Sequence, residues 1–182
     1  MSFIFDIETL GLESTTVILS AAITHLENDR EYTYQELLDS TKFIKFNKKE
    51  QIEAGRTITR STIDWWKEQE EHCKKISYYP NDIDISVIEG LSILREIYKK
   101  GETIWSRGSL DQIAIDSLAR TFKQEVIAPY WVYRDIRTAI DILKTSSKNG
   151  YCDIPDFDKT LVIKHDPIHD CSYDALQLLK GI

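Results

Sequence analysis

Apolar and acidic residues alternate in the segment FIFDIET, residues 3–9, close to the start of the chain. An apolar run of this kind predicts a short buried strand, which we expect over residues 1–7. Successive side chains of a strand point to opposite faces, so Asp6 and Glu8 share one face and can converge on a cation. Without a cation, two unit charges ~4 Å apart repel by ~4 kcal/mol at an effective dielectric constant of ~20. A solvated strand end is the competing interpretation of this pair alone.

Further strands are expected directly after this segment. Residues 15–26 are rich in β-branched and apolar side chains and predict a second strand, with Gly11 in the turn that precedes it. Residues 31–46 alternate less cleanly and predict one more strand or two. The chain therefore begins with antiparallel pairing.

Helices alternate with strands in the rest of the chain. The capping-box spacings of Ser61 with Asp64 and of Ser86 with Glu89 open two helices, and Gly101 ends the second. The further expected elements are a strand over 103–106, a helix over 111–122, a strand over 130–133, a helix over 135–144, a loop or insertion over 145–164, and a last helix from about 172 to 180. This order predicts an α/β fold, a mixed sheet with helices on its faces.

The length and the charge of the chain limit its class. One domain covering residues 1–182 is expected, because single domains usually run to ~100 to 200 residues. The 23 basic and 30 acidic residues give a net charge of −7, which argues against binding duplexes through a broad basic face. An enzyme that grips one strand end through metal ions needs only local positive charge.

A soluble protein of a reducing cytoplasm is expected. The first apolar run begins too close to Met1 for a secretion signal, and the most apolar window, residues 17–23, is too short for a bilayer, which needs ~20 residues. The three cysteines, at positions 73, 152 and 171, form no CxxC pair, so neither a disulfide framework nor a cysteine zinc site is supported.

Three more residues carry candidate chemistry. Asp111 follows the expected strand over 103–106, at the start of a helix, where a plain N-cap is the simpler interpretation of it alone. His169 lies just before the last expected helix and Asp174 within its first turns. Asp174 stands one turn before Leu178 and is turned towards the sheet, where a carboxylate needs a partner.

In chain order these residues form an Asp-x-Glu strand, a later Asp, and His-x4-Asp. The set resembles the DnaQ-like 3′-5′ exonucleases that use four acids and a histidine. Three further stretches, residues 59–67 (TRSTIDWWK), 134–138 (RDIRT) and 165–171 (HDPIHDC), are most similar to the exonuclease A group of tailed phages. The resemblance extends from residue 3 to about residue 180.

This resemblance implies an RNase H-like fold with a mixed central sheet flanked by helices. Asp6, Glu8 and Asp174 would hold one Mg²⁺ or Mn²⁺, Asp6 would help to hold a second ion, and Asp111 would join the cluster, partly through water. Two such ions stabilise both the attacking and the departing oxygen at phosphorus. His169 would take the proton from the attacking water, as an imidazole with a pKa near the working pH can do.

The same resemblance implies a substrate. Thr9 and Leu10 would meet the terminal nucleotide of single-stranded DNA, from whose 3′ end mononucleotides are removed, in the cytoplasm of a bacterium or a phage-infected host. The family often has Asn and Phe where this chain has Arg107 and Leu110. Because the acid itself is retained, this departure concerns the expected substrate contacts there and not the chemistry, and Arg107 could instead reach a phosphate.

A second register of the histidine motif is open, because His165 and Asp170 have the same five-residue offset. We prefer His169 with Asp174, since Pro167 should hold His165 in extended chain before the helix. Asp170 would then lie outside the helix or at its cap.

Other functions also remain open. An exoribonuclease of the same fold is one, since metals and a general base act on the phosphate and not on the sugar. A catalytically inactive nucleic-acid-binding accessory domain is another. A haloacid-type phosphatase fits less well, because it usually requires Asp-x-Asp-Gly-Thr and this chain has Asp-x-Glu-Thr-Leu.

Several residues outside the motif have structural roles as their simplest interpretation. Trp65 and Trp66 are expected in the core, with base stacking as the alternative. Asp135 is expected to be an N-cap. A basic stretch could follow the substrate backbone or form a solvated face; it comprises Lys42, Lys45, Lys48, Lys49, Arg56 and Arg60.

Overall fold

The computed structural model describes residues 1–27, 29–143 and 149–180. Its elements are, in chain order, β1 (Ser2–Thr9), β2 (Ile18–Leu26), α1 (Tyr34–Ser40), β3 (Lys42–Phe46), α2 (Lys48–Glu53), α3 (Arg60–Glu68), α4 (Glu71–Cys73), η1 (Lys74–Tyr78), β4 (Asp84–Ile85), α5 (Val87–Ile97), β5 (Thr103–Ser106), α6 (Leu110–Thr121), η2 (Tyr130–Val132), β6 (Tyr133–Asp135), α7 (Ile136–Leu143), η3 (Lys159–Leu161) and α8 (Pro167–Lys180). Within the described ranges, no helix has the length and apolar character that a membrane span requires.

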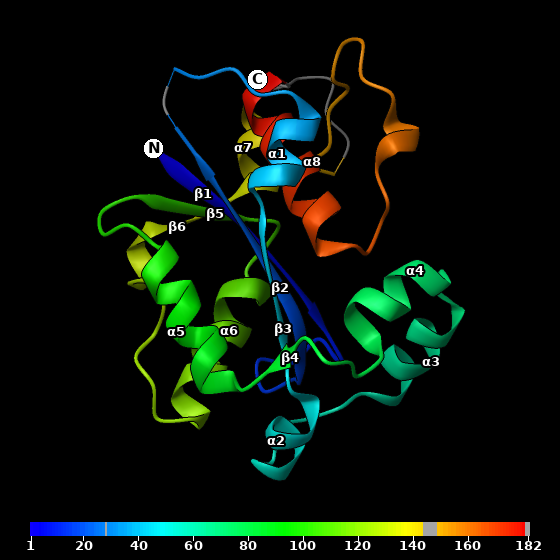
Figure 1. Ribbon diagram of the computed structural model, residues 1–182. Coiled ribbons are helices and arrows are strands. Elements are labelled where there is room, and N and C mark those ends of the chain that lie inside the picture. Colours follow the sequence, from blue (N-terminus) through cyan, green and yellow to red (C-terminus); the bar gives the residue numbers. More distant parts are fainter. Residues whose placement is uncertain (28, 144–148, 181–182) are drawn as a thin grey trace.

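One six-stranded sheet has the strand order β4-β3-β2-β1-β5-β6. β2 pairs antiparallel with both β1 and β3, whereas the β1–β5, β5–β6 and β3–β4 pairs are parallel. Figure 1 shows α5 and α6 gathered beside one part of the sheet and α1, α7 and α8 beside another. The predicted α/β architecture, a mixed sheet flanked by helices, is confirmed.

The alternation of β1 assigns its side chains to two cores. Phe3, Phe5 and Ile7 pack with residues of α5 and α6, whereas Ile4 packs with residues of α1, α7 and α8. Asp6 and Glu8 follow Ile4 at two-residue spacing and therefore lie on the side of the sheet that α8 covers.

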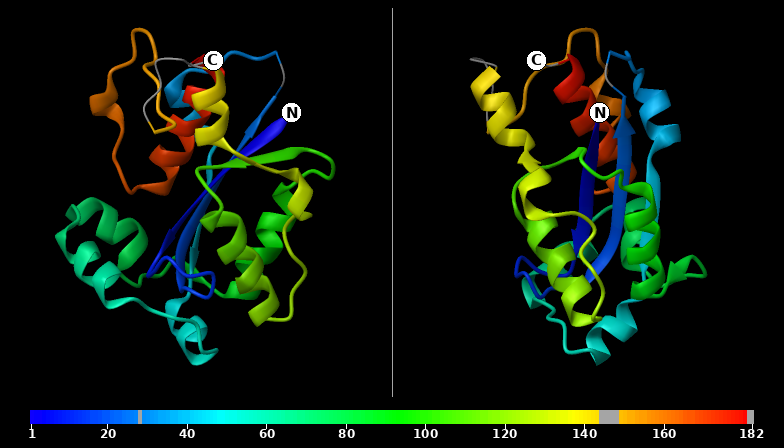
Figure 2. Two further views of the ribbon diagram at one scale, coloured as in Figure 1. Left: turned by 180° about the vertical axis from the view of Figure 1, so that it is seen from behind. Right: turned by 90° about the vertical axis from the view of Figure 1, so that its left-hand side faces the viewer.

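A smaller apolar cluster joins α3 and α4 to the carboxyl end of β1. It contains Leu10 and the fully buried Trp66, whose indole nitrogen donates to the carbonyl oxygen of Thr9 at 2.9 Å. Figure 1 and the left view of Figure 2 show this helical pair standing apart from the helices that flank the sheet. The pair anchors the chain where it leaves β1, next to the acidic residues.

The prediction of strand alone over 31–46 is wrong, because α1 precedes β3 there. The sequence carried the reason: Glu36 N–H donates to Thr33 Oγ1 at 3.2 Å, and Thr33 N–H donates to Glu36 Oε2 at 2.8 Å. This capping box satisfies two backbone donors at the start of α1.

The last helix begins at Pro167, five residues before the expected start at Ser172. Asp166 caps it, since its Oδ1 accepts from Ile168 N–H at 3.0 Å and its carbonyl accepts from Asp170 N–H at 2.9 Å. Proline is favoured in the first turn of a helix because it lacks the N–H that has no partner there. Asp170 is therefore a helical residue.

Most of the remaining element predictions are confirmed, several with shifted ends. The helices expected from 61, 86, 111 and 135 are α3, α5, α6 and α7; residues 144–148 of the expected helix and loop lie outside the described residues. The strand expected over 130–133 is wrong for 130–132, which form the 3₁₀ turn η2, and β6 begins only at Tyr133. Ser61 forms no capping box with Asp64, which pairs instead with Arg60 at 2.9 Å and Lys67 at 2.8 Å.

Replacing Trp66 by Phe should lower the free energy of unfolding by about 2 kcal/mol, because the carbonyl of Thr9 loses its donor in a buried place. Urea denaturation would measure this loss. Trp65→Phe on the same helix is the matched control and should change the stability by less, since Trp65 is 37% exposed. Equal effects of the two substitutions would contradict the anchoring role of Trp66.

Candidate active site

Carboxylates from three elements meet beside the carboxyl end of β1. Asp6 and Glu8 come from β1 and Asp111 from the first turn of α6. Asp111 is 7% exposed, and its Oδ1 accepts from Ile7 N–H at 3.1 Å. The parallel pairing of β5 with β1 ends at Ile4, so this N–H of β1 is left for the side chain. The N-cap interpretation of Asp111 is wrong, because Ser109 occupies the cap of α6.

The helix α8 adds two carboxylates, from Asp170 and Asp174. Burial raises the pKa of Asp6 well above its usual value, and the charges of Asp111, Glu8, Asp170 and Asp174 raise it further. Burial and then the charge of Asp170 likewise raise the pKa of Glu8. The acids thus crowd one another as the sequence predicts for Asp6 and Glu8.

The pKa values of Asp111 and Asp170 are raised as well. Burial raises the pKa of each to about 7, even though backbone N–H groups donate to both carboxylates and oppose the change. A bound cation would offset the desolvation and the mutual repulsion together.

His165 lies beside this cluster. Its Nδ1 or Nε2 and the carboxylate oxygens of Glu8 and Asp170 lie within 4.8 Å of one another, a group that could hold a metal ion. The backbone N–H of His165 donates to Asp170 Oδ2 at 2.8 Å, and the residue has a left-handed backbone with φ of 64°. Its ring meets Trp65 edge to face, with centroids 4.7 Å apart, and burial lowers its pKa.

His169 is held elsewhere by neutral groups. Its Nδ1 lies 2.9 Å from the hydroxyl of Tyr34 on α1 and 3.4 Å from the backbone nitrogen of Ile163. The structure therefore ties His169 to α1 and to the segment before α8. The expectation that Asp170 lies outside the helix or at its cap is wrong, because Asp170 lies within α8.

Asp174 is neutralised by a buried arginine. The Nε of Arg107 donates to both oxygens of Asp174, at 3.0 and 3.1 Å, and its terminal nitrogen makes a further short contact. The same guanidinium donates to the carbonyl of Gly150 at 2.7 Å and to the side chain of Gln177 at 2.9 Å. With side-chain exposures of 10% and 9%, Arg107 and Asp174 form a buried pair that locks the end of β5 to α8.

Thr9 and Leu10 are the residues expected to contact the terminal nucleotide. Both form hydrogen bonds within the turn that follows β1. The hydroxyl of Thr9 donates to the carbonyl of Gly11 at 2.7 Å. Leu10 is 4% exposed, and both its backbone groups are paired, with Val17 and Thr59. Its side chain is therefore a core residue, and Thr9 is the better placed of the two for a substrate contact.

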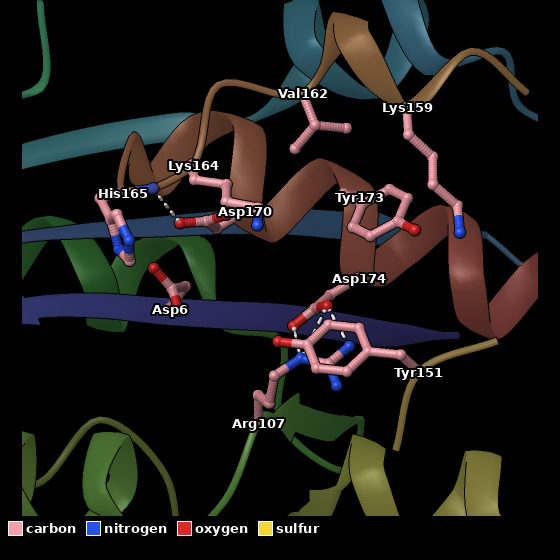
Figure 3. Close-up of a pocket in the computed structure, with 10 residues that line it drawn as sticks. All are labelled: Asp6, Arg107, Tyr151, Lys159, Val162, Lys164, His165, Asp170, Tyr173 and Asp174. Atoms are coloured by element: carbon pink, nitrogen blue, oxygen red, sulfur yellow. Dashed lines mark hydrogen bonds and ion pairs between the residues drawn. The ribbon is translucent and has the colours of Figure 1, made fainter. Parts of the chain in front are cut away.

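A cavity of about 550 Å³ opens beside the carboxylates. Figure 3 shows Asp6, His165 and Asp170 at one end of it and Arg107, Tyr151 and Lys159 at the other. Sequence patterns missed the residues from 150 to 164 that line it, because that segment has no hydrophobic period.

The remaining sequence predictions have mixed outcomes. Trp66 is core as expected, whereas Trp65 is partly exposed over His165. Asp135 caps α7 by accepting from the backbone of Thr138 at 3.1 Å, as predicted. The basic stretch is not one surface, since Lys45 and Arg56 are 2% and 6% exposed and bind backbone carbonyls.

Comparison with known proteins shows the family of the chain. Residues 1–179 match the model of a family described as the 3′-5′ exoribonuclease Rv2179c-like domain. The chain is also 32% identical, over 200 aligned residues, to the exodeoxyribonuclease of enterobacteria phage T4, with 97% of this chain and 86% of that protein covered.

The fold and the acidic cluster define an RNase H-like nuclease of the DnaQ-like 3′-5′ exonuclease class. Within this class, the chain belongs to the Rv2179c-like exonuclease family. Exonucleases of this type use divalent metal ions, and the hard oxygen donors that meet at the end of β1 suit such ions.

The raised pKa values of Asp111 and Asp170 predict how pH acts on the metal-free protein. An acid whose pKa is higher in the folded state stabilises the fold at low pH, and this contribution is lost as the pH rises through the folded value of about 7. The midpoint of thermal unfolding, Tm, should therefore decrease as the pH rises from about 5.5 to about 8. Mg²⁺ should raise Tm more at the higher pH.

Thermal unfolding with Mg²⁺ or with EDTA at both pH values measures these effects. Asp6→Asn is the control, because it removes one charge from the cluster and should reduce the fall in Tm. An Mg²⁺-induced rise in Tm that is the same at both pH values would argue against ionisation of the cluster as its cause.

Proposed function

We propose that the protein removes nucleoside monophosphates from the 3′ end of single-stranded DNA, with Mg²⁺ or Mn²⁺ and a water nucleophile. One observation carries this proposal, the convergence of Asp6, Glu8, Asp111 and Asp170 with His165 at the end of β1. The name of the T4 relative, an exodeoxyribonuclease, supports DNA as the substrate.

The carboxylates of Asp6, Glu8 and Asp170 are the proposed ligands of the ions, with Asp111 joining from α6. Two divalent ions would stabilise the charge on the attacking and the departing oxygen during displacement at phosphorus. Asp6 would be central among these ligands, since the charges of Asp111, Glu8, Asp170 and Asp174 all raise its pKa.

His165 is the proposed general base, in place of His169. Its burial favours the neutral imidazole, which can accept the proton of the attacking water. The contact with Asp170 fixes its backbone, and the ring of Trp65 limits the positions of the imidazole. In this assignment, His169 and Asp174 are structural residues, paired with Tyr34 and Arg107 respectively.

The two registers give opposite results in matched variants. His165→Ala should lower kcat by about 100-fold or more, the usual contribution of a general base, whereas His169→Ala should lower it by less than about tenfold. Asp170→Asn should weaken Mn²⁺ binding in calorimetry, and Asp174→Asn should leave it nearly unchanged. Loss of kcat in His169→Ala alone, with loss of Mn²⁺ binding in Asp174→Asn, would restore the register first preferred from the sequence.

Hydrolysis of RNA is the second candidate, because the matching family is described as an exoribonuclease family. The carboxylates and His165 act on the phosphodiester and would serve either sugar. Discrimination would depend on contacts to the 2′-hydroxyl of the terminal nucleotide.

Matched single-stranded DNA and RNA oligonucleotides with a 5′ label separate the two candidates. With Mg²⁺ or Mn²⁺, DNA should shorten one nucleotide at a time from its 3′ end, and faster than RNA. EDTA and a 3′-phosphate on the substrate are controls that should block the ladder. Undiminished cleavage in EDTA would refute a metal-dependent mechanism, and faster shortening of RNA would replace DNA as the substrate.

A further inference from the structure

The cavity beside the carboxylates extends beyond the acidic cluster. It measures about 550 Å³ and continues along α8, past Asp174, to the segment that contains Tyr151 and Lys159. Figure 3 shows this second end separated from Asp6 and His165 by the length of the cavity. The mechanism proposed above uses only the first end.

The first end carries an aromatic contact, and the second end is open to solvent. At the first end, the ring of Trp65 stands 4.7 Å from that of His165. At the second end, Tyr151 is 47% exposed and the side chain of Lys159 is 56% exposed. A strand whose terminal phosphodiester lies at the carboxylates can extend along the cavity and leave it through this open end.

Tyr151 forms a fixed aromatic platform at the open end. Its ring lies over the guanidinium of Arg107, with 4.0 Å between the guanidinium carbon and the ring centroid. Arg107 is itself held by Asp174, Gln177 and the carbonyl of Gly150. A ring ordered in this way loses little further freedom when a base stacks on it.

Local positive charge accompanies this platform. Two lysines line the cavity, and Figure 3 shows Lys159 on the side of Tyr151 and Lys164 beside Asp170. An ion pair of 2.6 Å with Asp153 restrains Lys159, and Figure 3 shows its amine directed into the cavity near Tyr173. Aromatic rings with cations beside them are the usual means of holding single strands.

We propose that Tyr151 stacks the base of the penultimate nucleotide, the one on the 5′ side of the bond that is cut, and that Lys159 meets a phosphate of that upstream strand. This inference rests on the proposed exonuclease function. It assigns a specificity-determining contact to a segment that contributes neither a metal ligand nor the general base.

Removal of the first nucleotide from two DNA oligonucleotides tests the contact. One oligonucleotide is intact and the other has an abasic tetrahydrofuran residue at the penultimate position. With the wild-type enzyme, loss of this base should raise KM about tenfold, as expected for one stacked base. Tyr151→Leu should raise KM about tenfold for the intact oligonucleotide and respond no further to the abasic residue, with kcat within about twofold of wild type in each case.

Tyr151→Phe is the matched control, because it retains the aromatic face and should behave as wild type. Equal abasic penalties in wild type and Tyr151→Leu would overturn the proposal, as would a Tyr151→Phe variant as impaired as Tyr151→Leu. Metal-dependent shortening of the intact oligonucleotide by the wild type separates these outcomes from a failure of the exonuclease function itself.

Discussion

The two-residue period of β1 is the constraint on which the rest of the structure depends. Because alternate side chains face opposite sides of the sheet, Phe3, Phe5 and Ile7 pack on α5 and α6, and Ile4 packs towards α8. Asp6 and Glu8 continue the row of Ile4 beyond the apolar part of the strand. A shift of one residue in this register would bury both acids in the larger core, where they would have no partners. Strand pairing and site geometry are therefore set by the same alternation.

The carboxylates of the cluster repel one another, so other groups must hold them in place. If all of these groups were cations, the cluster would lose the negative charge that attracts a metal ion. Neutral backbone donors hold two of the carboxylates, since Ile7 N–H binds Asp111 and His165 N–H binds Asp170. Asp174 is different, because Arg107 compensates its charge within a buried pair. The cluster thus keeps its negative potential on the side where a cation would bind. The positive charge of Arg107 stays at the contact between the end of β5 and α8.

Sequence patterns predicted the sheet, most of the helices and the acids of β1, because these depend on local periodicity. They failed where a local signal was outweighed or overlooked. The capping box of Thr33 with Glu36 marked α1, and Asp166 before Pro167 marked the start of α8. The second error changed the assignment of the histidine motif, since the helix phase of Asp170 depends on that start. No local pattern could have placed Arg107 against Asp174, because 67 residues separate them.

The raised pKa of Asp6 has a consequence for the balance between activity and stability. In the absence of a cation, each ionised acid of the cluster opposes folding, so the residues proposed for catalysis are also sites of stored electrostatic strain. Neutral amides at these positions would relieve it, as often happens when functional residues are replaced. Without bound metal ions, inactive variants should therefore have a higher free energy of unfolding than the enzyme itself. This makes them suitable for trapping a bound strand for crystallography.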